Sequence, residues 1–563
     1  MLETDVCIIG AGPAGIALAR ECIGQDFRVC LLESGGFEPD EALHALAKGE
    51  NAGLPYDRLD DARYRGFGGA SRAWSLDIGE GQDGARLRAL DPIDFERRDW
   101  VPHSGWPFDR AHLQPFYERA HGFFQVGPVD YEAAHWEDAR TRPRLPLGGD
   151  RVTSTVFQFG RAEPLAEQYR NEIHRADNIT TCIYATVTEL EANAGGTAVE
   201  RARVACLPGS TFVLMGSESG FQRVRVEPLA ANQFWVAARM FVLASGGTEN
   251  ARLLLVSRRA HTAGLGNQHD LVGRFFMEHP HIWSGRFVPA RPLPPETTAL
   301  YRVHSVRGVP VMAKLVLSEE ARRRERLLGY AVSIHPLRGP ALPDGAHSLL
   351  RLRRALRERS RPRRLGRHLR NVMSDADDIA ALAWRKARRR ARADHLAGDA
   401  VFRLDHMAEQ APSPSSRVTL SHQTDALGLP RVRLEWRLRP DDMRSMVRAQ
   451  EIVDEELRRA GLGRLQIELD AETPPPGLKG GWHHMGTTRM HVDPKQGVVD
   501  EHCRVHGVGN LYVAGSSVFP TGGYANPTLT LCALAIRLAD RVKRQMQSAI
   551  TLAPAKRSTE EDW

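Results

Sequence analysis

The sequence lacks several features that would place it in other classes of protein. No run of eighteen apolar residues occurs in its 563 residues, so we expect no membrane-spanning helix. None of the seven cysteines forms a C-x-x-C pair, which leaves no pattern for a zinc ribbon or an iron–sulfur cluster. There is no internal repeat, and the opening MLET leads straight into an apolar run that leaves no room for a signal peptide. We therefore expect a cytoplasmic protein with free, buried thiols.

An excess of positive charge is confined to one segment. Residues 351–395 contain fifteen Arg and one Lys against five Asp or Glu, a net +11, so the other residues carry −4 of the total of +7. Apolar residues recur at helical spacing from Leu365 to Met373, which predicts two or three basic amphipathic helices broken at Pro362. Such helices fit a solvated insertion, or a surface that binds an acidic partner or an anionic membrane. The segment holds a single aromatic residue, Trp384, which argues against nucleic-acid binding.

A dinucleotide-binding fingerprint opens the chain. An apolar, β-branched strand at 5–9 leads into a turn with Gly10, Gly12 and Gly15, then a helical pattern and a second apolar strand that ends at Glu33. The first glycine makes the turn, the second lets the backbone approach a diphosphate, and the third lets helix pack on strand. Glu33 lies where a carboxylate accepts from ribose hydroxyls. This pattern predicts a Rossmann-like site but does not separate FAD from NAD.

A second stretch that suggests chemistry runs from Gly481 to Leu531. The doublet His483-His484 stands among small and glycine residues rather than on an apolar periodic face. Downstream, Asn526 lies in a Gly/Pro-rich turn that follows a short apolar strand and opens an apolar helix. A strand, a glycine turn and a helix N-terminus direct backbone N–H groups at a ligand. A neutral His can take a hydroxyl proton, and an Asn amide can hold the oxygen.

The motifs of this stretch resemble a known family. H-x-M-G-T-x-x-M, N-L-Y-V-A-G-S-S-V-F-P and A-N-P-T-L-T resemble the C-terminal signature of the glucose-methanol-choline (GMC) flavin oxidoreductases, and look closest to pyranose oxidase and the bacterial FAD-dependent sugar dehydrogenases. The resemblance implies that His483 is the base at the flavin and Asn526 the second catalytic residue. Gly515 stands where many members have Asp, which puts one polar contact to the flavin in question. The flavin contacts implied here are Gly515, Ser516, Asn526, Pro527 and Thr528, and His484 is a candidate for substrate contact.

Two further glycine-rich segments favour FAD. RGFGGASRAW, which ends at Trp74, has no strand or helix pattern and resembles the family's flavin-contacting loop through Gly68, Gly69 and Ser71. Some relatives tether FAD through a His in or near this loop, and the loop from 66 to 78 has none, so we expect noncovalent FAD. Trp74 is a candidate substrate contact. The other segment, FWVAARMFVLASGGTENARLLL, reads as strand, glycine turn and helix, and makes Gly246 a candidate cofactor contact.

The segment VGRFFMEHP resembles the family's V-G-x-x-L-x-D-H-P. Glu278 replaces the commoner Asp, and His279 precedes a proline, which holds it in extended backbone. We interpret His279 as structural and the segment as the crossing into the substrate domain. Trp100 and Trp106 are interpreted as packing residues, although they could line the approach to the flavin.

The predicted fold class is mixed α/β. A Rossmann-like FAD-binding domain is expected to carry an inserted substrate domain built on an antiparallel sheet with helices. We expect three stretches to build the FAD-binding domain: 1–75, a β-meander at 151–275, and 480–548 with the catalytic residues. The other expected divisions are a cap or substrate-side segment (76–150), the substrate domain (276–479) with a basic helical insertion at about 338–400, and a C-terminal tail (549–563).

The predicted function is FAD-dependent oxidation of a CH–OH group, with His483 taking the hydroxyl proton while hydride passes to flavin N5. The resemblance favours a sugar, glycoside or polyol. A bulky lipid, sterol or natural-product alcohol is the alternative, and a flavin lyase without net redox chemistry is a further one. A metal site is disfavoured, because the spacing of its candidates is irregular and no carboxylate or thiolate completes a known pattern. The candidates are His483, His484, His491, His502 and His506. The electron acceptor, whether oxygen, quinone or protein, is left open, as are the substrate and the oligomeric state.

Overall fold

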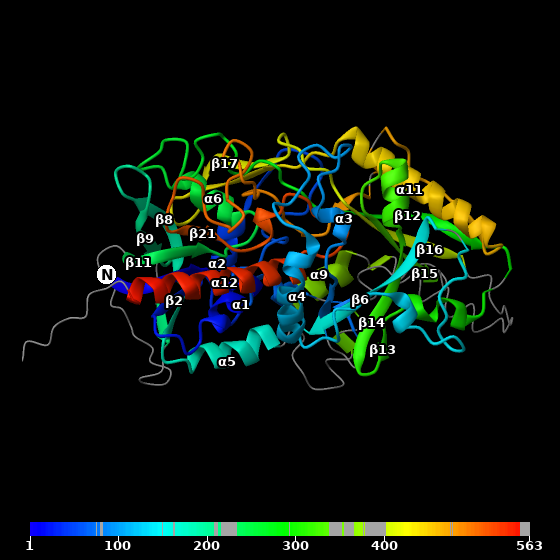
Figure 1. Cartoon of the computed structure of the whole chain (residues 1–563), viewed down its shortest axis with the longest axis horizontal. Helices are drawn as coiled ribbons and strands as arrows, with labels where there is room; N and C mark the ends of the chain where they lie inside the picture. The colour runs from blue at the N-terminus through cyan, green and yellow to red at the C-terminus, as the bar shows by residue number, and fades with distance from the viewer. Residues whose placement is uncertain are drawn as a thin grey trace, which may run out of the picture.

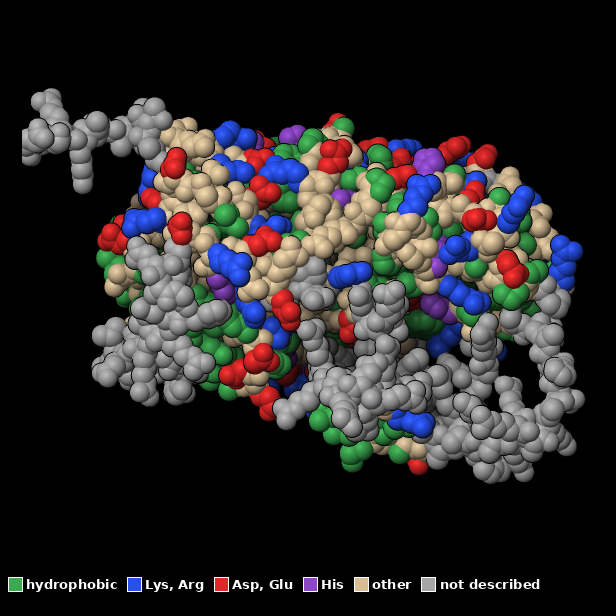
Figure 2. Space-filling model, turned by 90° about the horizontal axis from the view of Figure 1, so that it is seen from below, with side chains coloured by type: hydrophobic (Ala, Val, Ile, Leu, Met, Phe, Trp, Pro, Cys, Tyr) green, Lys and Arg blue, Asp and Glu red, His purple; other side chains and the backbone are tan. Residues whose placement is uncertain are grey.

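The computed structural model describes residues 1–551 except 75, 79–82, 149, 162–163, 208–211, 216–232, 292, 337–348, 350–351, 354–364, 375, 378–400, 473 and 476. Two large sheets lie toward opposite ends of the elongated molecule (Figure 1). Acidic, basic and apolar side chains are interspersed over the face drawn in Figure 2. Within the residues that the structure describes, no helix is long and apolar enough to cross a membrane. The expected helices of 351–395 lie outside the described residues, apart from α9 (Leu365–Ser374).

The first sheet has the order β10-β7-β2-β1-β11-β9-β8, with β21 beside β11. Its strands are β1 (Leu2–Ile9), β2 (Val29–Leu32), β7 (Ile179–Ile183), β8 (Thr186–Ala192), β9 (Val199–Ala205), β10 (Val213–Met215), β11 (Gln233–Leu243) and β21 (Leu511–Val513). β1 runs parallel to β2 and β11, and β21 is parallel to β11, whereas β9 is antiparallel to both β8 and β11. Strands from three distant stretches of the chain thus form one sheet.

The turn after β1 has a conformation that only glycine permits at two of its positions. Gly10 has φ of +110°, and a Cβ on it would lie 2.6 Å from the carbonyl oxygen of Ala244. A Cβ on Gly15 would lie 1.9 Å from the carbonyl oxygen of Gly10, so helix α1 (Pro13–Glu21) can pack this closely only without that atom. α1 begins with a proline, which suits the first helical position. The prediction of strand, glycine turn and helix is confirmed.

The second sheet is antiparallel, in the order β19-β12-β16-β15-β14-β6-β5-β4, with β13 beside β14 and β20 beside β12. Its strands are β4 (Leu76–Asp77), β5 (Asp83–Leu87), β6 (Val152–Arg161), β12 (Pro280–Pro289), β13 (His304–Val306), β14 (Val309–Leu317), β15 (Tyr330–Pro336), β16 (Phe402–Ala408), β19 (Gly463–Gln466) and β20 (Lys479–Gly480). The long helix α11 (Pro440–Arg459) contacts β19 and β6. Together the two sheets confirm the predicted mixed α/β class.

A small third sheet joins segments that are far apart in sequence. β17 (Arg417–Thr424) pairs with β18 (Pro430–Glu435), and β18 pairs in parallel with β3 (Gly49–Asn51). The remaining α-helices among the described residues are α2 (Glu41–His44), α3 (Pro92–Phe95), α4 (Arg110–Phe124), α5 (Tyr169–His174), α6 (Glu249–Val256), α7 (Glu319–Glu325) and α12 (Thr528–Thr551). α12, red in Figure 1, packs on α1 and α4. The turn that contains Asn526 therefore lies where the chain enters the helix beside the dinucleotide fingerprint.

Candidate active site

A cavity of about 1980 Å³ runs from the first sheet to the second. Gly10, Gly12 and Glu33 of the fingerprint lie in its wall, as do His483 and Asn526. Its other walls come from the 57–74 loop, the turn after β11, and the face of the second sheet that bears His281, Trp283 and Arg86. The two stretches that the sequence singled out thus open into one space.

The fingerprint end of the cavity has the features of a diphosphate cradle. The N-terminus of α1 lies in the wall, with Gly12, Pro13 and Ala14 facing the space. A Cβ on Gly12 would meet nothing closer than 3.9 Å, and on Gly246 nothing within 4 Å, so both backbones border open room. Glu33 accepts from the N–H groups of Ala11 (2.8 Å) and Gly35 (2.9 Å), which fixes its carboxylate at the end of β2.

At the other end, hydrogen bonds determine which nitrogen of His483 carries the hydrogen. Nε2 of His279 lies 3.3 Å from the carbonyl oxygen of Gly522, which can only accept, so this nitrogen carries the hydrogen and Nδ1 of His279 is an acceptor. Nδ1 of His483 lies 2.8 Å from that acceptor and must donate to it. His483 therefore presents an unprotonated Nε2, 3.0 Å from Nδ2 of Asn526. The base and the amide donor face each other in the cavity wall.

His483 is held neutral. Burial lowers its pKa well below the ordinary value, and the nearby His279, His281 and Arg86 lower it further. Burial likewise lowers the pKa of His279 to about 4. A neutral imidazole with a free lone pair is the form that can accept a proton.

Glu278 positions the backbone around this histidine. Its Oε2 accepts from the N–H groups of His279 (3.1 Å), Gly481 (3.0 Å) and His483 (2.9 Å). The hydroxyl of Tyr56 donates to Oε1. The side chain is completely buried, and burial raises its pKa to about 7 although four donors point at its oxygens. One carboxylate thus ties β12 to the segment that carries the His doublet.

His484 is directed away from this pair, as its place in an extended segment requires. Its Nε2 is 2.9 Å from the hydroxyl of Tyr56, and its Nδ1 is 3.3 Å from the hydroxyl of Thr248. Burial lowers its pKa to about 3, so it is neutral. His484 lies in the cavity wall, but both of its nitrogens already have protein partners.

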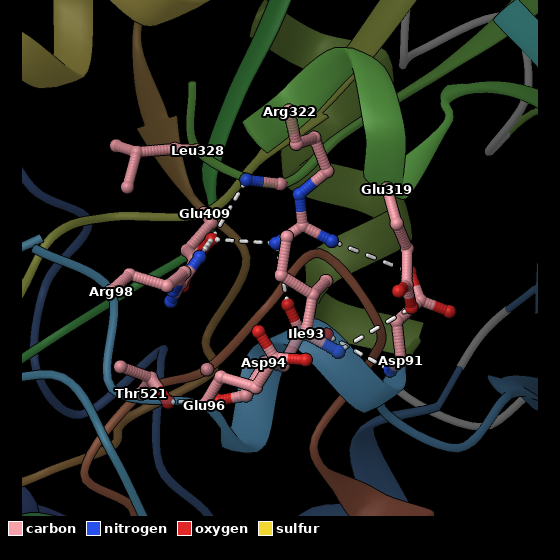
Figure 3. Close-up of polar contacts among 12 residues, drawn as sticks. Asp91, Ile93, Asp94, Glu96, Arg98, Glu319, Arg322, Leu328, Glu409 and Thr521 are labelled. Carbon is pink, nitrogen blue, oxygen red and sulfur yellow. Dashed lines mark hydrogen bonds and ion pairs between the residues drawn. The ribbon is translucent and has the colours of Figure 1, made fainter. Parts of the chain in front are cut away.

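The turn that carries Asn526 rests on a buried ionic network. Oγ1 of Thr521 donates to the carbonyl oxygen of Asp94 (2.6 Å), and the carboxylate of Asp94 accepts from Arg322 (2.6 Å). Arg322 also contacts Glu409, which receives two hydrogen bonds from Arg98 (Figure 3). The Arg98, Arg322 and Glu409 side chains are at most 1% exposed. The network anchors the turn from the side of the second sheet.

Comparison with known proteins agrees with this geometry. The GMC oxidoreductase C-terminal family model matches residues 412–535. 2-Methyl-1,2-propanediol dehydrogenase of Mycolicibacterium austroafricanum is 23% identical over 97% of this chain and 96% of its own length. The C-terminal part of this chain is thus similar to the GMC oxidoreductases. The fructose dehydrogenase large subunit of Gluconobacter japonicus is 24% identical over 97% of this chain and 99% of its own. Formate oxidase has a similar fold, with a TM-score of 0.53 at 14% identity over 97% of this chain and 99% of its own.

On these matches the chain is an FAD-dependent oxidoreductase that acts on CH–OH groups. The residues present fit FAD: a helix N-terminus and open glycine backbone for the diphosphate, and a cavity long enough to continue to His483. Gly515 and Ser516 also line it. A Cβ on Gly515 would meet nothing closer than 4.0 Å, so the backbone borders open room there.

Most of the site residues predicted from sequence meet in the cavity wall, and three do not. Gly69, Trp74, Gly246, Pro527 and Thr528 join the residues already described. Gly15 does not line the cavity and instead allows α1 to pack closely on the Gly10 turn. Gly68 and Ser71 do not line it either, and the hydroxyl of Ser71 donates to the carbonyl oxygen of Gly68.

Trp100 and Trp106 are packing residues, as predicted. The indole N–H of Trp106 donates to Oγ1 of Thr521, and that of Trp100 donates to the carbonyl oxygen of Leu327. The five histidines weighed as a metal site are split between separate contacts: His506, for example, bonds the carbonyl oxygen of His491. No group of three metal-binding side chains occurs among the described residues.

Sequence reasoning missed Tyr56, Thr248, Arg86 and Asp405. Tyr56 and Thr248 stand in segments without a motif and are brought to His484 only by the tertiary fold. Arg86 and Asp405 belong to strands of the second sheet, where alternation of polar and apolar residues gives a weak signal that one face is polar. His279, predicted to be structural, proves to contact the candidate base directly.

Proposed function

We propose that this chain oxidises a CH–OH group of a sugar, glycoside or polyol, with His483 as the base and Asn526 as the residue that holds the alcohol oxygen. The supporting observation is the pairing of an unprotonated Nε2 with an amide donor 3.0 Å away, in the wall of the cavity that begins at the dinucleotide fingerprint. This arrangement supplies one acceptor and one neutral donor at the same point, which oxidation of an alcohol requires.

An alcohol placed between the two side chains would exchange their mutual hydrogen bond for two new ones. Its O–H would donate to Nε2 of His483, and Nδ2 of Asn526 would donate to its oxygen. As the proton moves to Nε2, His483 becomes cationic, and its Nδ1–H bond to His279 keeps the ring in place. Bound FAD supplies the hydride acceptor, at N5.

The relatives support a polyhydroxylated substrate. The matched proteins include 2-methyl-1,2-propanediol dehydrogenase and the fructose dehydrogenase large subunit, each matched over more than nine tenths of its length. The cavity also offers a stacking surface, because Trp283 is 46% exposed and lies in the wall. Aromatic rings of this kind present an apolar face to a sugar while polar side chains bind its hydroxyls.

An anaerobic screen tests the proposal. Sugars, glycosides, polyols and long-chain alcohols are added to the FAD-loaded protein, and bleaching of the flavin absorbance is recorded before air is admitted. We expect sugar-type alcohols to bleach the flavin. If only sterols or long-chain alcohols bleach the flavin, the substrate is a bulky lipid alcohol and not a sugar-type alcohol. If no alcohol bleaches it, a flavin protein without net redox chemistry is favoured. The rate on admission of air, compared with added quinone, identifies the acceptor.

The division of the chain is proposed along the two large sheets. The first sheet, with α1 and α12, would bind FAD, and the second sheet would bind the substrate. The parallel pairing of β3 with β18 means that residues 49–51 belong to the same small sheet as 417–435, so this division does not follow a simple cut in sequence.

A further inference from the structure

Two basic side chains on the second sheet, one buried and one half-buried, have no hydrogen-bonded counter-ion among the described residues. Lys314 is completely buried, and its Nζ has no hydrogen-bond partner there. Nε of Arg86 is buried without a partner in the same way, and Arg86 forms no ion pair within the described ranges. Nζ of Lys314 lies over the ring of Phe157, 5.3 Å from its centroid, and no carboxylate bonds to it among the described residues. Buried charges are normally paired, so these two basic groups mark a place where an anionic ligand would be stabilised.

Both basic groups lie on the face of the sheet that borders the cavity. Lys314 of β14 pairs with Thr155 of β6, and Arg86 of β5 pairs with Phe159 of the same strand. Thr155 and Phe159 are four residues apart, so their side chains are on one face of β6. Paired residues and residues two apart share a face of a sheet, so Lys314 and Arg86 are on the same side. Arg86 itself lines the cavity.

A single carboxylate accompanies them. Burial lowers the pKa of both Arg86 and Lys314, and the nearby Asp405 opposes this for each, although no ion pair joins it to either among the residues described. Asp405 lies 3.7 Å from Nδ1 of His281, and the ring of His281 is 6.1 Å from that of His483. The basic groups thus stand one side chain beyond the candidate base, at the substrate end of the cavity.

The unpartnered atoms of this face include two nitrogens that only donate when their side chains are charged. These are Nε of Arg86 and Nζ of Lys314, and they stand with one carboxylate oxygen of Asp405, the Ser333 hydroxyl and Nε2 of His281 and His335, within the described residues. A neutral hydroxyl would bring a further hydrogen that needs an acceptor, whereas a carboxylate brings acceptors only. A bound anion also favours the protonated form of Lys314. Two cations against one carboxylate then leave one positive charge, which matches a monoanion.

We propose that the substrate is an acidic alcohol, of the sugar-acid or hydroxy-acid class, whose carboxylate binds Arg86 while its hydroxyl lies at His483 and Asn526. This rests on the proposed function and narrows it from neutral sugars to their acids. Arg86 would hold the carboxylate with two parallel N–H bonds, and the buried Lys314 on the same face of the sheet would add positive charge without lining the cavity.

The test measures binding without turnover. Cyclohexanecarboxylate, which has no hydroxyl, is titrated into the FAD-loaded protein against the matched neutral amide, with the flavin spectrum and the melting temperature as readouts. A charge-assisted bond predicts that the acid binds about 10- to 100-fold more tightly than the amide. We expect Arg86→Gln to abolish this preference and Arg86→Lys to retain part of it. Arg286→Gln, on the same sheet but outside the cavity wall, should leave it unchanged.

Equal binding of acid and amide to the wild-type protein would overturn the proposal. So would an acid preference that Arg86→Gln and Arg286→Gln reduce alike, because that would reflect net charge alone. Flavin reduction by glucuronate and by glucose separates this inference from the function it rests on. If glucose is faster and the reaction needs His483, the acid preference is wrong and alcohol oxidation stands. If no alcohol or hydroxy acid reduces the flavin, alcohol oxidation is wrong.

Discussion

At the scale of single residues, the site is determined by the order of donors and acceptors. The carbonyl oxygen of Gly522 can only accept, and from that one constraint the hydrogens of His279 and His483 follow in sequence. Nε2 of His483 is left as the acceptor beside Asn526. Glu278 holds the same chain in place from its backbone side. The position of the hydrogen on the proposed base is thus set by its protein partners, His279 and the carbonyl group of Gly522.

The pH dependence of flavin reduction follows from these residues. His483 acts when neutral, and its pKa lies well below 6.5, while burial raises the pKa of Glu278 to about 7. Both groups are in their working forms above pH 7, because a base is deprotonated above its pKa and a carboxyl is ionised above its own. We expect the limiting rate of anaerobic flavin reduction to be constant from about pH 7.5 to 9 and to fall on the acid side. A rate that keeps rising across that alkaline range would contradict this assignment.

At the scale of elements, the Asn526 turn depends on what lies beneath it. Gly523 has φ of +54°, and a Cβ there would lie 2.3 Å from Oδ2 of Asp94. Asp94 cannot yield easily, since Oδ1 accepts from Arg322 and Oδ2 accepts from the N–H of Asp91. The turn, α3 and the buried network therefore have to fit one another.

Gly523→Ala tests this fit. We expect it to lower the free energy of unfolding by more than about 1 kcal/mol and to slow flavin reduction, because the turn moves Asn526 away from His483. Gly428→Ala is the matched control: Gly428 also has positive φ (+78°), but nothing lies within 4 Å of its Cβ position. The control should cost about 1 kcal/mol of stability without slowing reduction. Equal effects of both changes on the rate would show that strain at Gly523 is not transmitted to the site.

The local elements could be predicted from sequence because their signals are local. β1 ends at Ile9 and β2 at Leu32, as the fingerprint predicted, and α6 follows the glycine turn after β11. The His483–Asn526 pairing followed from the motifs. The contacts of Tyr56 and Glu278 could not be predicted, because they join residues more than 200 positions apart through tertiary packing. Arg86 and Lys314 of the second sheet were missed for another reason, because a single Arg or Lys in a strand is normally an exposed residue.

At the scale of the whole molecule, the cavity joins the first large sheet to the second. The residues along the flavin-contacting loop and the neighbouring wall include no cysteine among those the structure describes, and the loop at 66–78 has no histidine. The cofactor would be retained by burial and by hydrogen bonds from the α1 N-terminus and the glycine turns.

We therefore expect FAD to be bound noncovalently. The purified protein should be yellow, and precipitation with acid or heat should release all of its flavin as FAD into the supernatant. Flavin that stays with the precipitated chain, or recovery of FMN, would show that this prediction is wrong. Gly15→Ala, which places a Cβ 1.9 Å from the carbonyl oxygen of Gly10, should give protein without flavin or no folded protein at all.

The central claim is that His483 is the base, and anaerobic stopped-flow reduction of the flavin tests it most directly. His483→Ala, Asn526→Ala and His484→Ala are compared with wild type after their FAD content has been matched. Removal of a positioned general base slows the reaction by ~10² to 10⁴, so we predict that loss for His483→Ala. We expect a smaller loss for His484→Ala, and weaker substrate binding as well as slower reduction for Asn526→Ala. Reduction of the His483→Ala flavin within a few-fold of wild type would contradict the account.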